Sequence, residues 1–203
     1  MKLFRRCGAL CALALVAVLV PACAPGANPF CVAEMHTVHT LDYSIEDFLD
    51  LTGKSDMKYC DTGARGPEEQ VITGALITAP DGTQTLRLRR EIQKWGAPFK
   101  TWDYDLTLSG ADIGDGFTTG TYELGDHDTH SLSWLNRIHY PDDDHERVYE
   151  SSTGVLQITA LEVGPADELG VAEITHFRGY YSVEYPPGDM ITEERNTIRI
   201  GRL

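Results

Sequence analysis

The sequence predicts a mainly β domain, an antiparallel β-sandwich or a partly closed β-barrel with one short N-terminal helix. From residue 71 onward apolar and polar residues alternate with a period of two, which is typical of strands buried on one face. Turn-forming residues separate these segments at short intervals. The long helical crossovers of a parallel α/β fold are missing from the pattern. Sandwich and barrel both remain open.

The short helix is expected in the segment 41–51. Ser44 is a suitable N-cap, and Ile45, Phe48 and Leu49 fall on one face at helical spacing.

A β-hairpin follows. Segments 71–78 and 85–92 flank Pro80-Asp81-Gly82, in which proline presets the turn and glycine accepts a positive φ. Another strand is expected at 102–108, where four apolar residues alternate with polar ones. The further strands are expected at 119–124, 132–134, 148–151, 155–163, 172–185 and 197–200. Gly179 interrupts one of these segments, which suggests a bulge or a close backbone contact.

The N-terminus has the layout of a signal peptide. Lys2, Arg5 and Arg6 precede an uncharged apolar run from Cys7 to Val20. This run is shorter than the roughly 20 residues that a helix needs to cross the hydrocarbon core of a bilayer. We therefore expect cleavage rather than a permanent transmembrane anchor.

The run ends in Val20-Pro21-Ala22-Cys23, which resembles the lipobox of bacterial lipoproteins. The resemblance implies that Cys23 is lipidated on its sulfur, that the chain is cut before it and that the new amino terminus is acylated. Several acyl chains anchor a protein stably. The expected organisation is a signal peptide at 1–22, a lipidated tether at 23–30 and a single β-rich domain at 31–203. Ala24 stands where an aspartate indicates inner-membrane retention, so the resemblance favours the outer membrane, facing periplasm or exterior.

Composition and charge limit the partners. The chain is 42% hydrophobic and 24% charged, which is typical of a folded domain. Removal of residues 1–22 takes away three basic residues and no acidic one, so the formal net charge changes from −14 to −17. So acidic a surface repels phosphate backbones, and no basic stripe is present; nucleic acid is therefore not an expected partner.

Two cysteines are left for the folded domain, because Cys7 and Cys11 lie in the signal peptide and Cys23 is expected to carry lipid. In an oxidising compartment Cys31 and Cys60 are expected to form a disulfide. A zinc site that adds His36 and His39 is the alternative, but its ligand spacing does not match the usual zinc motifs.

A second cluster of residues that can ligate metals, histidines and aspartates, lies between residues 126 and 146. Imidazoles with carboxylates suit Zn²⁺, and carboxylates alone suit Ca²⁺. The competing interpretation is a pair of solvated turns, in which Asp and His cap backbone groups. The candidate ligands are Asp126, His127, Asp128, His130, His139 and His145.

Catalytic signatures are absent: the sequence has no Gly-x-Ser-x-Gly, no His-Glu-x-x-His and no glycine-rich phosphate loop. The segments 120–124, 152–159 and 174–181 resemble small bacterial lipoproteins whose all-β secreted domains have no assigned activity. This resemblance implies no catalytic residue, and the sequence predicts no cofactor other than the possible Zn²⁺ or Ca²⁺ of the cluster at 126–146. The sequence therefore favours a lipid-anchored, noncatalytic binding or structural module without a named protein or glycan partner. A metal-binding protein and an unrecognised hydrolase are the alternatives.

Overall fold

The computed structural model describes residues 30–45, 49–63, 68–110, 116–127, 130–140, 145–151, 153–186 and 191–201. Within these ranges it contains eleven strands and no helix. The strands are β1 (Ala33–Ile45), β2 (Leu49–Asp61), β3 (Glu68–Thr78), β4 (Gln84–Lys94), β5 (Ala97–Ser109), β6 (Gly120–Asp126), β7 (Ser131–Tyr140), β8 (His145–Ser151), β9 (Thr153–Ala166), β10 (Val171–Glu184) and β11 (Ile191–Ile200). The chain is therefore mainly β, as predicted.

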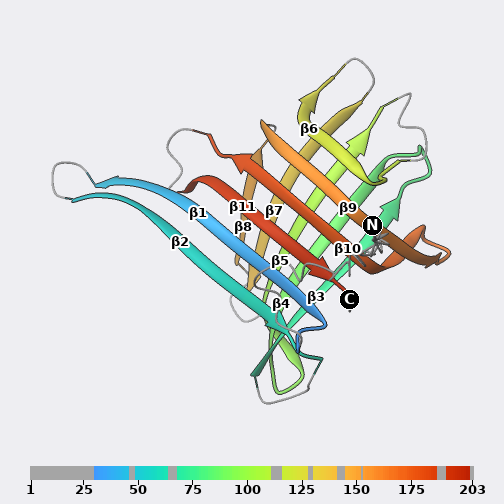
Figure 1. The fold of residues 1–203 in the computed structure, drawn as a ribbon, viewed down its shortest axis with the longest axis horizontal. Coiled ribbons are helices and arrows are strands. Elements are labelled where there is room, and N and C mark those ends of the chain that lie inside the picture. The colour runs from blue at the N-terminus through green and yellow to red at the C-terminus, as the bar shows by residue number, and fades with distance from the viewer. Residues whose placement is uncertain are drawn as a thin grey trace, which may run out of the picture.

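The strands form one large antiparallel sheet in the order β2-β1-β11-β10-β3-β4-β5-β7-β6-β9, with β8 paired to β7. β10 contacts three strands: residues 171–173 pair with β3, residues 177–184 pair with β11, and β9 runs along the opposite edge. The pairings from β3 to β9 thus return to β10, while β11, β1 and β2 extend from it. Figure 1 shows β1 and β2 projecting from the remaining strands as a long hairpin.

The helix predicted over 41–51 is wrong. β1 runs through Ile45 and pairs with β2, so that Ser44 lies opposite Asp50 and Ile45 opposite Leu49. The residues between the two strands, 46–48, lie outside the described residues. A helix of so few residues is marginal in water by itself, whereas residues 41–45 pair with residues 49–53 of β2, and Leu41 also pairs with Ile191 of β11.

The predicted hairpin at 71–92 is confirmed as β3 and β4. Ala79 and Thr83 close the loop through a 2.8 Å backbone hydrogen bond, and Asp81 accepts a 2.9 Å hydrogen bond from the Thr83 amide. Gly82 adopts a φ of 90°, which favours glycine over any residue with a Cβ. The turn residues in the sequence therefore predicted this loop correctly.

The hydrophobic core lies on one face of these strands. Leu86 and Leu88 of β4 are fully buried, while Arg87 and Arg89, which alternate with them, point to the other face. Burial of this apolar area is the main stabilising contribution to the fold. Around Trp134 the core is aromatic, because its ring stacks on Tyr104 at a centroid distance of 5.5 Å and contacts the tilted ring of Tyr181 at 4.3 Å. The core residues with the lowest exposure are Met35, Leu86, Leu88, Leu106, Leu132, Trp134, Leu156, Phe177, Tyr181 and Val183.

β9 and β10 approach closely at two glycines. The register of the pair shifts between Arg178 and Gly179, and a Cβ on Gly179 would lie 2.5 Å from Phe177 Cζ. Gly154 has a φ of 148°, and a Cβ there would lie 2.2 Å from the Ser182 carbonyl oxygen. The irregularity predicted at Gly179 is therefore present.

Candidate functional site

A buried polar network lies between β1, β10 and β11. Glu194 is 1% exposed, and its carboxylate accepts hydrogen bonds from the hydroxyls of Tyr181 at 2.9 Å and Tyr185 at 2.7 Å. The Asn196 amide donates to the same carboxylate, and His39 Nε2 lies 3.6 Å from it. A buried carboxylate is tolerated when its lone pairs are satisfied in this way. The network therefore rigidifies the sheet where β1 meets β11.

The pKa values in this network follow from burial and hydrogen bonding. Burial by itself would raise the pKa of Glu194, but the hydrogen bond and charge of His39, with the hydroxyls of Tyr185 and Tyr181, lower it below its ordinary value of 4.5. Burial and the neighbouring Glu194 charge raise the pKa of both tyrosines. Glu194 is thus the ionised acceptor, and the two tyrosines are neutral donors.

Arg90 is the buried cation of the described core. Its side chain is 4% exposed, and its guanidinium lies 3.4 Å from the centroid of the Trp102 ring and 3.7 Å from that of Tyr59. Its Nε has no hydrogen-bond partner among the described residues. Burial raises the pKa of Tyr59, and Arg90 opposes this through its charge and a hydrogen bond. The two rings therefore take the place of water around this cation.

On the opposite face of β4 and β5, arginines and aspartates form cross-strand pairs. Arg87 contacts Asp105 through two hydrogen bonds of 2.7 Å and 2.8 Å, and Arg89 contacts Asp103 through two of 2.6 Å and 2.9 Å. The pairs sit directly opposite one another in the β4–β5 register. Arg137 of β7 lies farther away, at 3.7 Å from Asp105. The N–H donors of Arg137 are therefore available to another partner, whereas Arg87 and Arg89 each donate two hydrogen bonds to an aspartate.

This face is hollowed into a groove of about 330 Å³. Four strands contribute to it, because β7 lies between β5 and β8 and brings its outward residues beside theirs. The lining residues are Arg89, Glu91, Pro98, Thr101, Asp103, Arg137, His139 and Glu146. Its volume falls at the lower end of the range of small-molecule sites, and its walls carry charges of both signs.

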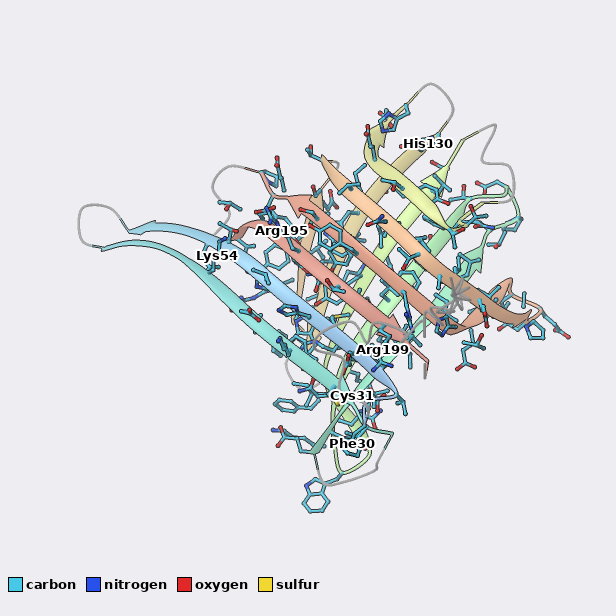
Figure 2. All side chains as sticks on the ribbon, viewed as in Figure 1. Phe30, Cys31, Lys54, His130, Arg195 and Arg199 are labelled. Carbon is cyan, nitrogen blue, oxygen red and sulfur yellow. A yellow bond between two sulfur atoms is a disulfide. The ribbon has the colours of Figure 1, made fainter. Side chains whose placement is uncertain are left out.

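The predicted metal ligands lie at two ends of one strand. His127 and His130 flank the β6–β7 turn, where their ring centroids are 4.9 Å apart, and Asp126 pairs with the first residue of β7. His139 lies near the last residue of β7, opposite Glu146 of β8. Because β7 has ten residues, these ends are separated by about 30 Å. Figure 2 shows His130 far from Cys31 and Phe30.

Of two further candidates, one lies outside the described residues and the other is described by its backbone alone. Asp128 lies outside the described residues, and the structure gives the backbone of His145 as the first residue of β8. Among the described residues, no three His, Cys, Asp or Glu side chains gather as a metal-binding group. The metal site therefore stays a prediction, and its candidate ligands divide into a pair at the β6–β7 turn and His139 in the groove.

The predicted disulfide is present. Cys31 and Cys60 are bonded, with their Cα atoms 5.4 Å apart, and the bond joins the start of the domain to the end of β2. The predicted lipidation residue, Cys23, lies outside the described residues. None of the described residues belongs to a helix long and apolar enough to span a bilayer.

Sequence reasoning did not identify the buried network or the groove. Glu193, Glu194 and Arg195 look like a solvated charge run, yet Glu194 shares its face with Asn196 and Ile198. The two-residue period of β11 was the signal that could have revealed its burial. The groove depends on which strands are neighbours, because it combines β4, β5, β7 and β8.

Comparison of the chain with protein-family models, with curated proteins and with solved structures gives no match.

Proposed function

We propose that this chain is a lipid-anchored protein of the bacterial envelope, and that its folded domain is a noncatalytic module that binds a small polar ligand. The signal-type N-terminus and the lipobox-like Val20-Pro21-Ala22-Cys23 support the anchor. Ala24 supports the outer membrane as the location. The groove on the face of β4, β5, β7 and β8 is the observation that carries the binding role.

The pairings around β10 support the barrel alternative for the fold. Because β10 pairs with β9 on one edge and with β3 on the other, the strands from β3 to β9 follow a path that returns to its start. β10 contributes only three paired residues to β3, and β6 contributes two to β7, so closure is partial. We therefore favour a partly closed barrel with the β1–β2 hairpin and β11 as an extension.

The charges of the groove define the class of ligand. Arg137 retains donors for a carboxylate, since Asp105 is already occupied by Arg87. Glu91 of β4 and Glu146 of β8, on the two outer strands of the groove, supply acceptors for an ammonium group. A small zwitterion that carries both groups, such as a short peptide or an amino acid, matches this distribution. Fork-shaped binding of a carboxylate by a guanidinium supplies the directional part of the recognition.

An NMR titration tests this proposal with three small probes. Glycylglycine carries both charges, N-acetylglycine only the carboxylate and glycinamide only the ammonium group. We expect saturable shifts at Arg137 and His139 with glycylglycine, weaker effects with the other two, and none in Arg137→Ala. Arg195→Ala, which removes an exposed arginine on β11, is the matched control. Equal shifts in wild type and Arg137→Ala, or shifts that do not saturate, contradict the proposal.

A metal-binding function is the second candidate, supported by the ring contact between His127 and His130. His127 Nε2 lies 3.2 Å from the Glu123 carbonyl oxygen, an arrangement that leaves Nδ1 free to ligate when Nε2 carries the proton. Two imidazoles with Asp126 nearby suit Zn²⁺ better than Ca²⁺. This site is local to the β6–β7 turn and does not include His139.

A further inference from the structure

The tip of the β4–β5 hairpin carries a large apolar side chain in an unfavourable backbone conformation. β4 and β5 are joined by the two residues Trp95 and Gly96, with φ values of 55° and 79°. Such a loop normally has asparagine or aspartate first, because a positive φ is strained for a bulky side chain. Trp95 is nevertheless 85% exposed, so no packing within the described chain compensates for the strain. Strain of this kind indicates a functional constraint.

The neighbours of Trp95 have the chemistry of a membrane interface. Phe99 is also exposed, and Lys94 Nζ lies 3.7 Å from the centroid of its ring. Lys100 Nζ lies 4.4 Å from the Trp102 ring. Tryptophan with lysine is typical of the headgroup region, where an amphipathic ring meets apolar chains on one side and water on the other. Glu68 lies opposite Lys94, so the tip has no strong net charge.

The N-terminal tether begins at this end of the molecule. Val32 pairs with Asp61 through a 2.7 Å backbone hydrogen bond, and the Asp61 carboxylate accepts from the Ile72 amide of β3 at 3.2 Å. Ile72 lies opposite Arg90 in the β3–β4 register, and Arg90 precedes Lys94 in β4 by four residues. Phe30 is 78% exposed. Figure 2 shows Phe30 and Cys31 at the end where the β4–β5 hairpin projects, as labelled in Figure 1.

The length of the tether limits how far this end can lie from the bilayer. Phe30 follows Cys23 by seven positions, and an extended chain of that length spans at most about 25 Å. We propose that Trp95 and Phe99 insert into the headgroup region of the membrane that holds the lipid anchor, and thereby orient the domain with its groove close to the lipid surface. This proposal rests on the lipid anchor at Cys23.

Tryptophan quenching by brominated lipid tests the contact. The full chain, purified with its anchor, is reconstituted into phosphatidylethanolamine and phosphatidylglycerol vesicles, with acyl chains either brominated near the glycerol end or unbrominated. We expect bromine to reduce the fluorescence of the wild-type protein. Trp95→Ala should show no such loss, because Trp134 is buried in the core and Trp102 lies under Arg90. Equal fractional quenching of wild type and Trp95→Ala, or no quenching of either, overturns the proposal.

Leu169→Ala is the matched control, because Leu169 is 82% exposed at the opposite end of the molecule, beside the end of β3. Its quenching should equal that of the wild type. Flotation of a chain that begins at Ala24, and so lacks both Cys23 and the apolar signal segment, separates this proposal from the anchor. If only the wild type floats with vesicles, the anchor holds and quenching decides the contact. If both float, the anchor is wrong while quenching still decides the contact, and if neither floats, both proposals fail.

Discussion

The Tyr185 hydroxyl donates a 2.7 Å hydrogen bond to Glu194 Oε2 and so connects the residue after β10 to the middle of β11. Tyr181 and Asn196 donate to the same carboxylate, so Glu194 accepts three hydrogen bonds although it is buried. Removal of its charge while its shape is kept isolates the electrostatic part of its contribution to stability.

We expect Glu194→Gln to lower the free energy of unfolding by about 1–3 kcal/mol at neutral pH, because two tyrosine donors lose an ionised acceptor. Glu193→Gln, next to it on the exposed face, should change it by less than about 1 kcal/mol. Urea denaturation measures the free energy of unfolding of both variants. Equal effects of the two substitutions would show that burial of Glu194 does not matter.

The same carboxylate predicts an acid-labile contribution. The pKa of Glu194 in the folded protein lies below its ordinary value of 4.5, which is taken for the unfolded chain. Its stabilisation is therefore complete above that value and is lost as the pH falls through the folded-state pKa. We expect the stability of the wild type to decline below about pH 4.5 more steeply than that of Glu194→Gln. Parallel stability curves for the two proteins would contradict this assignment.

Arg90 offers a second test of the interior. We expect Arg90→Ala to cost about 2–4 kcal/mol, because it removes both ring contacts and leaves a cavity. Arg90→Met fills most of that space without a charge, so it should cost less. Thermal unfolding orders the two variants. A cost for Arg90→Met as large as for Arg90→Ala would mean that the charge, rather than packing between Tyr59 and Trp102, stabilises this region.

Gly154 should tolerate no side chain. A Cβ at this position meets the Ser182 carbonyl oxygen at 2.2 Å and the Val183 Cα at 2.9 Å. We expect Gly154→Ala to destabilise the protein by at least about 2 kcal/mol, since the β9 and β10 backbones must separate. At Gly120 the nearest atom to a Cβ is Tyr122 Cε2 at 3.9 Å. Gly120→Ala should therefore be close to neutral in the same denaturation experiment, and a large loss there would contradict the explanation.

Metal titration distinguishes the two ends of β7. We expect Zn²⁺ bound by this chain to be lost from a His127→Ala, His130→Ala variant and retained by His139→Ala, because about 30 Å separates the two positions. Inductively coupled plasma mass spectrometry of the untagged protein measures the content. Loss of the metal from both variants would show that the two ends contribute to one site.

Sequence patterns predicted most strands because their chemistry is local. Alternation in 102–108 fixed the inward face of β5, and Pro80-Asp81-Gly82 fixed the β3–β4 turn. The segment 41–51 misled because Ile45, Phe48 and Leu49 fit a helical period while Leu41, Tyr43 and Ile45 fit a period of two. Pairing of β1 with β2 and β11 decided between these patterns, and β11, which begins at Ile191, lies outside any short window around this segment.

The candidate sites were harder to predict, because they depend on contacts between distant residues. His39 and Glu194 lie opposite each other in the β1–β11 register although 155 positions separate them. Arg90 is an ordinary polar residue in the β4 sequence until Tyr59 of β2 covers it. The disulfide was predictable because counting cysteines, together with the expectation of an oxidising compartment, sufficed for Cys31 and Cys60.

The most direct test of the central claim is the mass of the N-terminal peptide of the protein, purified from membranes of a bacterium that expresses the full chain. We predict a peptide that starts at Cys23 and carries a diacylglyceryl group and an N-linked acyl chain, whereas a Cys23→Ala chain stays unprocessed. A peptide with an unmodified Cys23, or a mature terminus at another residue, would contradict the lipid-anchored account.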